Sequence, residues 1–165
     1  MHLQNLITRL LRYNLWANDR LASWILTLER QVIYTPTGSS FGTIDRTIQH
    51  ILEAQVYWHN VIVNGQIGEV KLSSGMDATH LVSALVASSH QLIDDISIFN
   101  EQQLIEAIQV SDSKQSRYEY VLHMVNHGSY HRGQVVTMCR ALGVKGEIPV
   151  TDYDAYLWWI ENHPM

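Results

Sequence analysis

The sequence is poor in the residues that mark several large classes of protein. Its 165 residues include one cysteine, Cys139, which excludes an internal disulfide and, being typical of a reducing compartment, predicts a cytoplasmic protein. Charged residues make up only 16% of the chain, and the formal net charge is -5. A protein that binds duplex nucleic acid usually carries a basic surface, so we expect no nucleic-acid partner.

Long apolar runs are also missing. No stretch approaches the roughly 18 to 20 uninterrupted apolar residues that cross a bilayer. No run of Lys and Arg is present that would hold the chain on an anionic membrane. The N-terminal segment lacks a compact apolar region with a small-residue cleavage site, so it does not resemble a signal peptide. We therefore expect a soluble protein with no membrane partner.

The chain does have enough apolar residues to build a core. Hydrophobic residues make up 46% of it, and a chain of this length buries enough apolar surface to fold unaided. No internal repeat or boundary divides the sequence, which predicts a single domain over residues 1–165.

Four segments repeat apolar residues at three- and four-residue steps, as one face of a helix does. They run from about residue 2 to 28, 43 to 62, 78 to 96 and 117 to 142. Asp77 is a predicted N-cap, and Gly65 and Gly143 are predicted helix stops. A short extended or hairpin segment fits residues 106–120, and a short aromatic helix fits residues 151–163. The pattern predicts an all-α four-helix bundle with a short C-terminal helix.

The unusual count is nine histidines, and three of them follow one another in the last long segment. His123, His127 and His131 are spaced by four residues, which offsets neighbours by about 40° on one helical face. Two imidazoles so placed can bind one metal ion, whereas three drift by about 80° around the helix. The alternative is that they are surface histidines or hydrogen-bonded core histidines.

A further metal ligand has to come from another helix. His50 is the strongest candidate because its face also carries apolar residues, and nearby Glu53 fits a fourth ligand, a general base or a solvated carboxylate. Gly128 and Ser129 follow His127, so the His-Glu-x-x-His motif of zinc peptidases is absent. The remaining histidines are expected at the surface or at helix ends: His2, His59, His80, His90 and His163.

Several segments together resemble the DinB/YfiT-like family of bacterial four-helix-bundle proteins. They read YNLWANDRL, FGTIDRTIQHILEAQVYW, HMVNHGSYHRGQV and GEIPVTDYDAYL, in the family's order. The resemblance implies an up-down-down-up bundle whose metal ligands are His50, His127 and His131. It also implies that His123 lies beside the site without being a ligand.

The resemblance further implies a thiol-dependent S-transferase-like activity, in which one divalent ion, Zn or Ni, activates a thiol or water. The expected partners are a small-molecule thiol or electrophile and a second copy of the chain in a homodimer. Pocket-lining groups are expected at Tyr13, Asn14, Tyr57 and Gln134. Two alternatives stay open: a non-catalytic stress-response protein with a structural metal, and an unmetallated interaction module whose C-terminal aromatic helix meets a partner.

Overall fold

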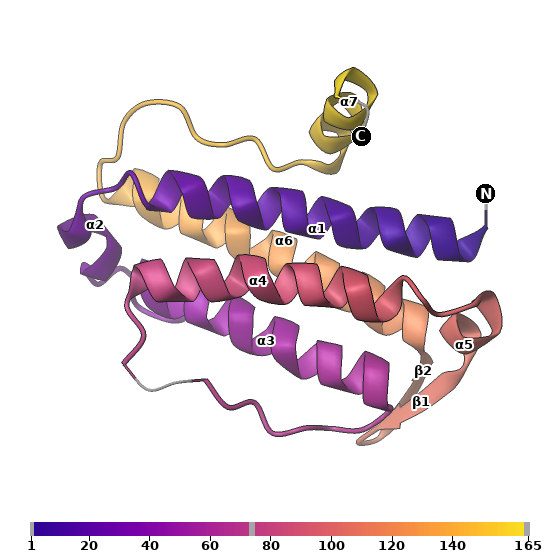
Figure 1. Ribbon diagram of the computed structural model, residues 1–165. Helices are drawn as coiled ribbons and strands as arrows, with labels where there is room; N and C mark the ends of the chain where they lie inside the picture. Colours follow the sequence, from indigo (N-terminus) through magenta and orange to yellow (C-terminus); the bar gives the residue numbers. More distant parts are fainter. Residues whose placement is uncertain (1, 73–74, 164–165) are drawn as a thin grey trace.

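The structure, a computed structural model, describes residues 2–72 and 75–163, and it is mostly helical (Figure 1). Its elements in chain order are α1 (Leu3–Ile25), α2 (Arg30–Tyr34), α3 (Ile44–Asn64), α4 (Ala78–Ile96), α5 (Glu101–Ile105), β1 (Ala107–Val110), β2 (Ser113–Ser116), α6 (Arg117–Ala141) and α7 (Tyr153–Asn162).

The four long helices α1, α3, α4 and α6 form a bundle. Helix α3 packs against α4 and α6, and α1 packs against the same two helices, so α1 and α3 lie diagonally. Figure 1 shows α1 and α6 running in one direction and α3 and α4 in the other. The prediction of an up-down-down-up helical bundle is confirmed.

Three helix ends have local chemistry that is visible in the sequence. Gly65 ends α3 with a φ of 70°, a left-handed conformation that favours glycine. The Asp77 side chain accepts a hydrogen bond from the backbone N–H of His80 at 2.9 Å and caps α4. At the start of α6, Ser116 and Glu119 form a reciprocal capping box. These ends agree with the predicted bounds.

Some elements differ from the prediction. Helix α1 ends at Ile25, short of Leu28, because the backbone N–H groups of Thr27 and Leu28 bond in a tighter turn to the carbonyls of Trp24 and Ile25. Helices α2 and α5 were not predicted, since five residues are too few to show a periodic apolar face. The suspected hairpin is present: β1 and β2 pair antiparallel, with Ala107 opposite Ser116.

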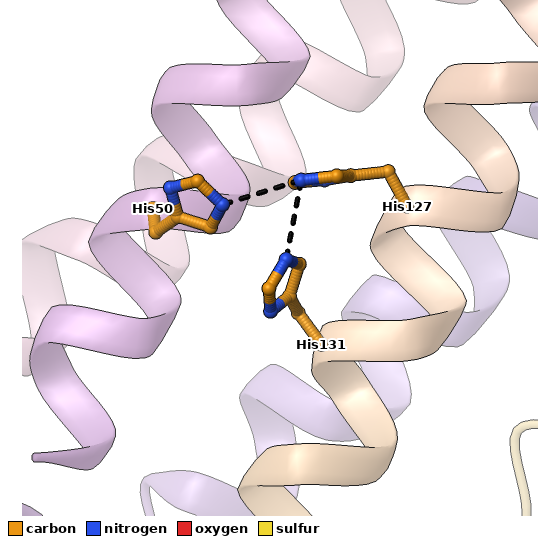
Figure 2. A group of neighbouring side chains, drawn as sticks. All are labelled: His50, His127 and His131. Atoms are coloured by element: carbon orange, nitrogen blue, oxygen red, sulfur yellow. Dashed lines mark hydrogen bonds between the residues drawn. The ribbon is translucent and has the colours of Figure 1, made fainter. Parts of the chain in front are cut away.

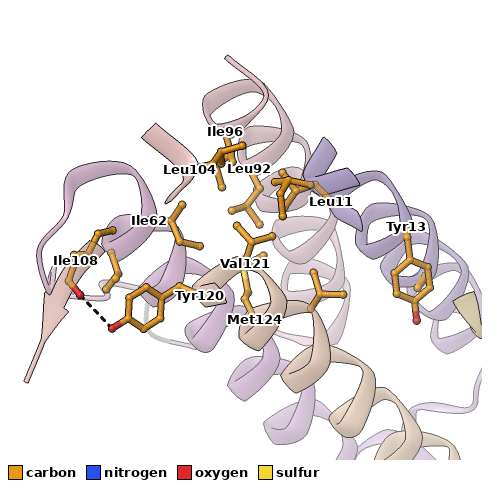
Figure 3. Close-up of a cluster of buried hydrophobic side chains, with 14 of the residues drawn as sticks. Leu11, Tyr13, Ile62, Leu92, Ile96, Leu104, Ile108, Tyr120, Val121 and Met124 are labelled. Carbon is orange, nitrogen blue, oxygen red and sulfur yellow. Dashed lines mark hydrogen bonds between the residues drawn. The ribbon is translucent and has the colours of Figure 1, made fainter. Parts of the chain in front are cut away.

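The buried side chains form two apolar clusters along the bundle. Figure 3 shows the cluster at the hairpin end, where Ile62, Leu92 and Val121 meet from three helices. The second cluster, at the other end, includes Leu21 and Met138. A layer of buried polar residues separates the two clusters on all four helices: Asn14 and Asn18 on α1, Gln55 on α3, Ser89 on α4 and Arg132 on α6.

Helix α7 lies on the outside of α1 (Figure 1). Tyr156 is its one buried residue within the described part of the chain. In residues 2–72 and 75–163, no helix has both the length and the apolar character that a membrane span requires.

Candidate metal centre

The three histidines from α3 and α6 meet in the bundle (Figure 2). His127 and His131 are one turn apart on α6, and His50 faces them from α3. The Nε2 atom of His127 lies 3.2 Å from Nε2 of His50 and 3.1 Å from Nε2 of His131. One nitrogen from each ring lies within 4.8 Å of the other two. His127 and His131 therefore lie together, as their four-residue spacing suggested, and His50 of the facing helix adds a third nitrogen.

A hydrogen bond to Gln134 leaves the Nε2 atom of His131 available as an acceptor. The Gln134 side-chain oxygen is 2.7 Å from His131 Nδ1, so this nitrogen carries the proton and donates it. The Nε2 lone pair of His131 then points to the other two rings. A partner that fixes the tautomer of an imidazole in this way is typical of metal-ligating histidines.

Burial and the neighbouring imidazoles favour the neutral form of His127 and His50. Desolvation, followed by the charges that His131, His50 and His123 would carry, lowers the pKa of His127 to about 4. Burial and then His131 lower the pKa of His50, against the opposing effect of Glu53. Neutral imidazole is the form that binds a metal ion.

The distances also fit a shared ion. Two nitrogens bound to one ion at about 2.0–2.1 Å lie about 3.3–3.4 Å apart in tetrahedral geometry and about 2.9 Å apart at right angles. The two Nε2–Nε2 distances fall between these values. His127 Nε2 contacts both of the other Nε2 atoms, and one cation placed among the three rings would accept a lone pair from each. The cluster is compatible with metal binding.

An aromatic ring covers one side of the site, and two cavities lie near it. Phe41 stacks on the His50 ring with centroids 4.1 Å apart. The Glu53 carboxylate is not part of the metal-compatible group in the described residues; it accepts a hydrogen bond from Gln49 at 2.7 Å. A cavity of about 520 Å³ adjoins Gln134 and Tyr130, and one of about 370 Å³ adjoins His123.

The other histidines lie apart from the cluster. The His123 ring is 6.0 Å from that of His127 and packs edge-on against Trp58. His59 is more enclosed than a surface residue, because it bonds Asp95 of α4 at 2.8 Å. Exposed positions or helix ends were expected for four others and are found: His2, His80, His90 and His163.

The buried polar layer beside the triad was missed from the sequence. Arg132, next to His131, is 1% exposed and has no acidic partner among the residues described. Its guanidinium donates to the side-chain oxygens of Asn14 at 3.1 Å and Asn18 at 2.8 Å, and to Ser129 at 2.9 Å. Burial lowers its pKa. The four-residue spacing of Asn14 and Asn18 on an apolar face was the available signal.

This layer also corrects two expected pocket residues. Asn14 is 2% exposed and donates to the Gln55 side-chain oxygen at 2.8 Å, so it joins helices and lines no cavity beside the triad. Tyr13 donates to the Thr151 carbonyl at 2.9 Å on the side of α1 that faces α7. Gln134 does adjoin the cluster, through His131. Tyr57 packs edge-on against Trp58.

Fold and site together define a helical-bundle protein with a candidate three-histidine metal centre. The DinB family model matches residues 1–163, and the chain belongs to the DinB family. It is similar to the protein DinB of Bacillus subtilis (strain 168), with 23% identity over 163 residues that cover 91% of this chain and 92% of the relative.

Solved structures of DinB-like proteins share the fold. One from Bacillus subtilis has a TM-score of 0.72 and 16% identity, covering 87% of this chain and 97% of the other. Another, from Bacillus cereus, has a TM-score of 0.58 and 10% identity, covering 81% and 91%. At these identities the likeness shows the fold alone.

Proposed function

We propose that this protein binds one divalent metal ion, Zn or Ni, through His50, His127 and His131. We further propose that it acts as a metal-dependent enzyme on a small thiol or water, in the manner of a thiol S-transferase. The observation that carries the proposal is the convergence of three imidazole nitrogens, one from each ring, within 4.8 Å of one another. Imidazole suits both metals, and the metal available to the protein influences which one it holds.

An ion held by three histidines keeps at least one coordination position open, as catalytic zinc sites do. Bound there, it would supply a Lewis acid that lowers the pKa of a thiol or a water molecule. For a thiol, the sulfur would form a bond to the electrophilic carbon while the leaving group departs with the bonding pair. The thiol proton would pass to solvent.

The chain's own residues hold and enclose the reacting groups. Gln134 fixes the orientation of His131, and Phe41 covers one face of His50. The cavities beside Gln134 and His123 are of the size that small ligands occupy, roughly 300–1,000 Å³. Each cavity comes next to the cluster through one residue, Gln134 or His123, and none of the three clustered histidines lines it.

A purely structural metal is the alternative role for the same site. Structural zinc sites are usually closed by four protein ligands. In the described residues the metal-compatible group has three members and does not include Glu53. This open group favours the enzyme over the structural role.

The first test is metal analysis of protein purified without a histidine tag or a nickel column. We expect about one Zn or Ni per chain, and its loss in His50→Ala and His127→Ala. His123→Ala is the matched control, because His123 lies on the same helix outside the group, and it should keep the metal. Wild-type protein that stays empty after incubation with both metals would overturn the proposal.

The second test is a panel of small thiols with alkyl and aryl halides, assayed on the metal-loaded protein. We expect thioether formation that chelation abolishes and His123→Ala does not eliminate. Metal-loaded protein with no turnover across the panel, in thiol transfer or in hydrolysis, would leave the structural role as the better account.

A further inference from the structure

A groove lies under the C-terminal helix, on the face of α1 that carries α7. It consists of two adjoining cavities of about 410 Å³ and 470 Å³, which share Arg12, Tyr156 and Ile160 as lining residues. Helices α1, α4 and α7 supply its walls. None of its lining residues belongs to the histidine cluster, so the groove is a separate feature from the candidate metal centre.

The first cavity is mainly aromatic and apolar, and the exposed side chains of Asp19 and His90 also line it. Trp16 of α1 packs against Tyr156 and Trp159 of α7, with ring centroids 5.6 Å and 6.3 Å away. Tyr156 and Trp159 are nearly parallel, at 20°. Tyr156 itself is buried, so the ring surface that this cavity presents comes from Trp16 and Trp159, with Ile93 and Ile160 beside them. Aromatic rings of this kind contribute both buried area and directional stacking to a bound ring.

The second cavity is polar and carries positive charge. Arg9 and Arg12 line it, in a protein whose formal net charge is -5. Both arginines lie close enough to the Tyr156 phenol to oppose the rise in its pKa that burial causes. The phenol therefore stays neutral beside two cations and has a hydroxyl to offer. Arginine is the side chain best suited to a carboxylate, since its planar fork donates two parallel hydrogen bonds.

We propose that this groove binds an aromatic carboxylate, with its ring on Trp16 and Trp159 and its carboxylate on Arg12. The groove has an apolar wall at one end and arginines at the other. It therefore favours a ligand that has an apolar ring at one end and a negative charge at the other. A neutral aromatic molecule meets only the first half of the site. An aromatic amine meets the arginines unfavourably.

The test uses three probes with one ring system and different charges: 2-naphthoate, 2-naphthalenemethanol and 2-naphthylmethylamine. Each is titrated into the metal-loaded protein while the indole N–H signals of the five tryptophans are followed by NMR. Phe variants of each tryptophan assign the signals. We expect 2-naphthoate to shift the signals of Trp16 and Trp159, leave those of Trp24 and Trp58 in place, and bind more tightly than the alcohol, with the amine weakest.

Arg12→Gln isolates the charge, because Arg12 is exposed and its replacement should leave the fold intact. A lost charge-assisted hydrogen bond predicts roughly tenfold weaker binding of 2-naphthoate with no change for the alcohol. Arg30→Gln, on α2 away from the groove, is the matched control and should bind as the wild type does. Equal affinity for all three probes, or 2-naphthoate binding unchanged in Arg12→Gln, would overturn the proposal.

Two further measurements distinguish a ligand groove from the metal centre and from a dimer interface. Binding of 2-naphthoate should be unchanged in His127→Ala, so failure of the proposed metal site leaves this inference standing. Sedimentation of the wild type at the NMR concentration shows whether the protein is a monomer or a dimer. A dimer in which Trp16 and Trp159 do not respond to 2-naphthoate would mean that the groove is an interface, and the proposal would be wrong.

Discussion

His127 lies between two other imidazoles, and this position sets its acid–base behaviour. Its Nε2 atom contacts both neighbours, and desolvation is the largest cause of its lowered pKa. A proton on His127 would bring positive charge next to His50 and His131 without a carboxylate in contact to balance it. The same arrangement that disfavours a proton favours a divalent ion, which accepts the lone pairs that would otherwise face one another.

The metal-free protein should lose stability as the pH falls from about 6.5 to 4. In this window the unfolded chain protonates His127 at its ordinary pKa of 6.5, whereas the folded protein does so only near 4. The unfolded state then binds more protons, so the free energy of unfolding decreases on acidification. Since His127 is partly exposed, we expect a contribution of about 1–2 kcal/mol after solvent screening. His50 acts in the same direction.

Urea unfolding of chelator-treated protein at pH 7 and pH 4.5 measures this effect as a difference between variants. His127→Gln should unfold with a weaker pH dependence than the wild type. His2→Gln, which changes an exposed histidine at the N-terminus, should keep the wild-type dependence. If the free energy of unfolding falls by the same amount in His127→Gln and in the wild type on acidification, the lowered pKa of His127 does not cause the loss of stability between pH 6.5 and 4.

Helix α6 contributes residues both to the core of the bundle and to the histidine cluster. It supplies two of the three clustered histidines, one member of the polar layer, and residues of both apolar clusters. Its residues therefore pack in the apolar core, in the polar layer and in the histidine cluster. For this reason its buried residues do not form one apolar stripe. Its close approach to α1 depends on Gly128, since a methyl group there would lie 3.1 Å from Arg132 and 3.3 Å from Asn14.

Gly128→Ala should therefore destabilise the protein, by about 1–3 kcal/mol, although alanine is the better helix former. The guanidinium of Arg132 is buried and held by Asn14 and Asn18, so it cannot move away. The matched control is Gly133→Ala on the same helix, where the added methyl group meets nothing within 4 Å. That variant should be more stable by about 0.5–1 kcal/mol. Thermal or urea unfolding of the two variants checks the opposite signs, and a stabilised Gly128→Ala would contradict the close packing.

The elements also show what the sequence can and cannot predict. Helix ends that depend on local chemistry, such as those at Gly65 and Asp77, were predictable because the residue that ends or caps the helix acts on backbone within one turn of it. The pair His127 and His131 was predictable for the same reason. Which helix faces that pair is a property of the whole fold, so the assignment of His50 depended on family resemblance.

The polar layer was not predicted because its hydrogen bonds join residues of different helices. Asn14, Gln55 and Arg132 each interrupt an apolar face, and each alone is consistent with a solvated position. Only their arrangement shows that they hydrogen-bond to one another, so that the two terminal nitrogens of a buried guanidinium are held by amide and hydroxyl oxygens. The roles of the three histidines as metal ligands, homodimerisation and a cytoplasmic location stay predictions.

At the scale of the whole molecule, two apolar clusters are joined through a polar layer, and the histidine cluster lies beside that layer. Hydrogen bonds link α6 to α1, α1 to α3, and α3 to α4 through Arg132, Asn14 and Gln55. The contact of His50 with His127 then adds a direct link between α3 and α6. A metal ion at this point would bind the folded arrangement and not the unfolded chain, in which the two helices are apart.

Metal loading should therefore raise the melting temperature of the whole protein. A ligand that binds only the folded state adds about 2.7 kcal/mol at a free concentration one hundred times its Kd. For a chain of this size that free energy corresponds to roughly 5–10 °C. Differential scanning calorimetry with and without Zn or Ni measures the shift, and His123→Ala should show it while His50→Ala should not. Mg²⁺, which prefers oxygen ligands, should leave all three proteins unchanged. An equal response of His50→Ala and the wild type to Zn would mean that the stabilising ion binds elsewhere, because α3 would then contribute no ligand.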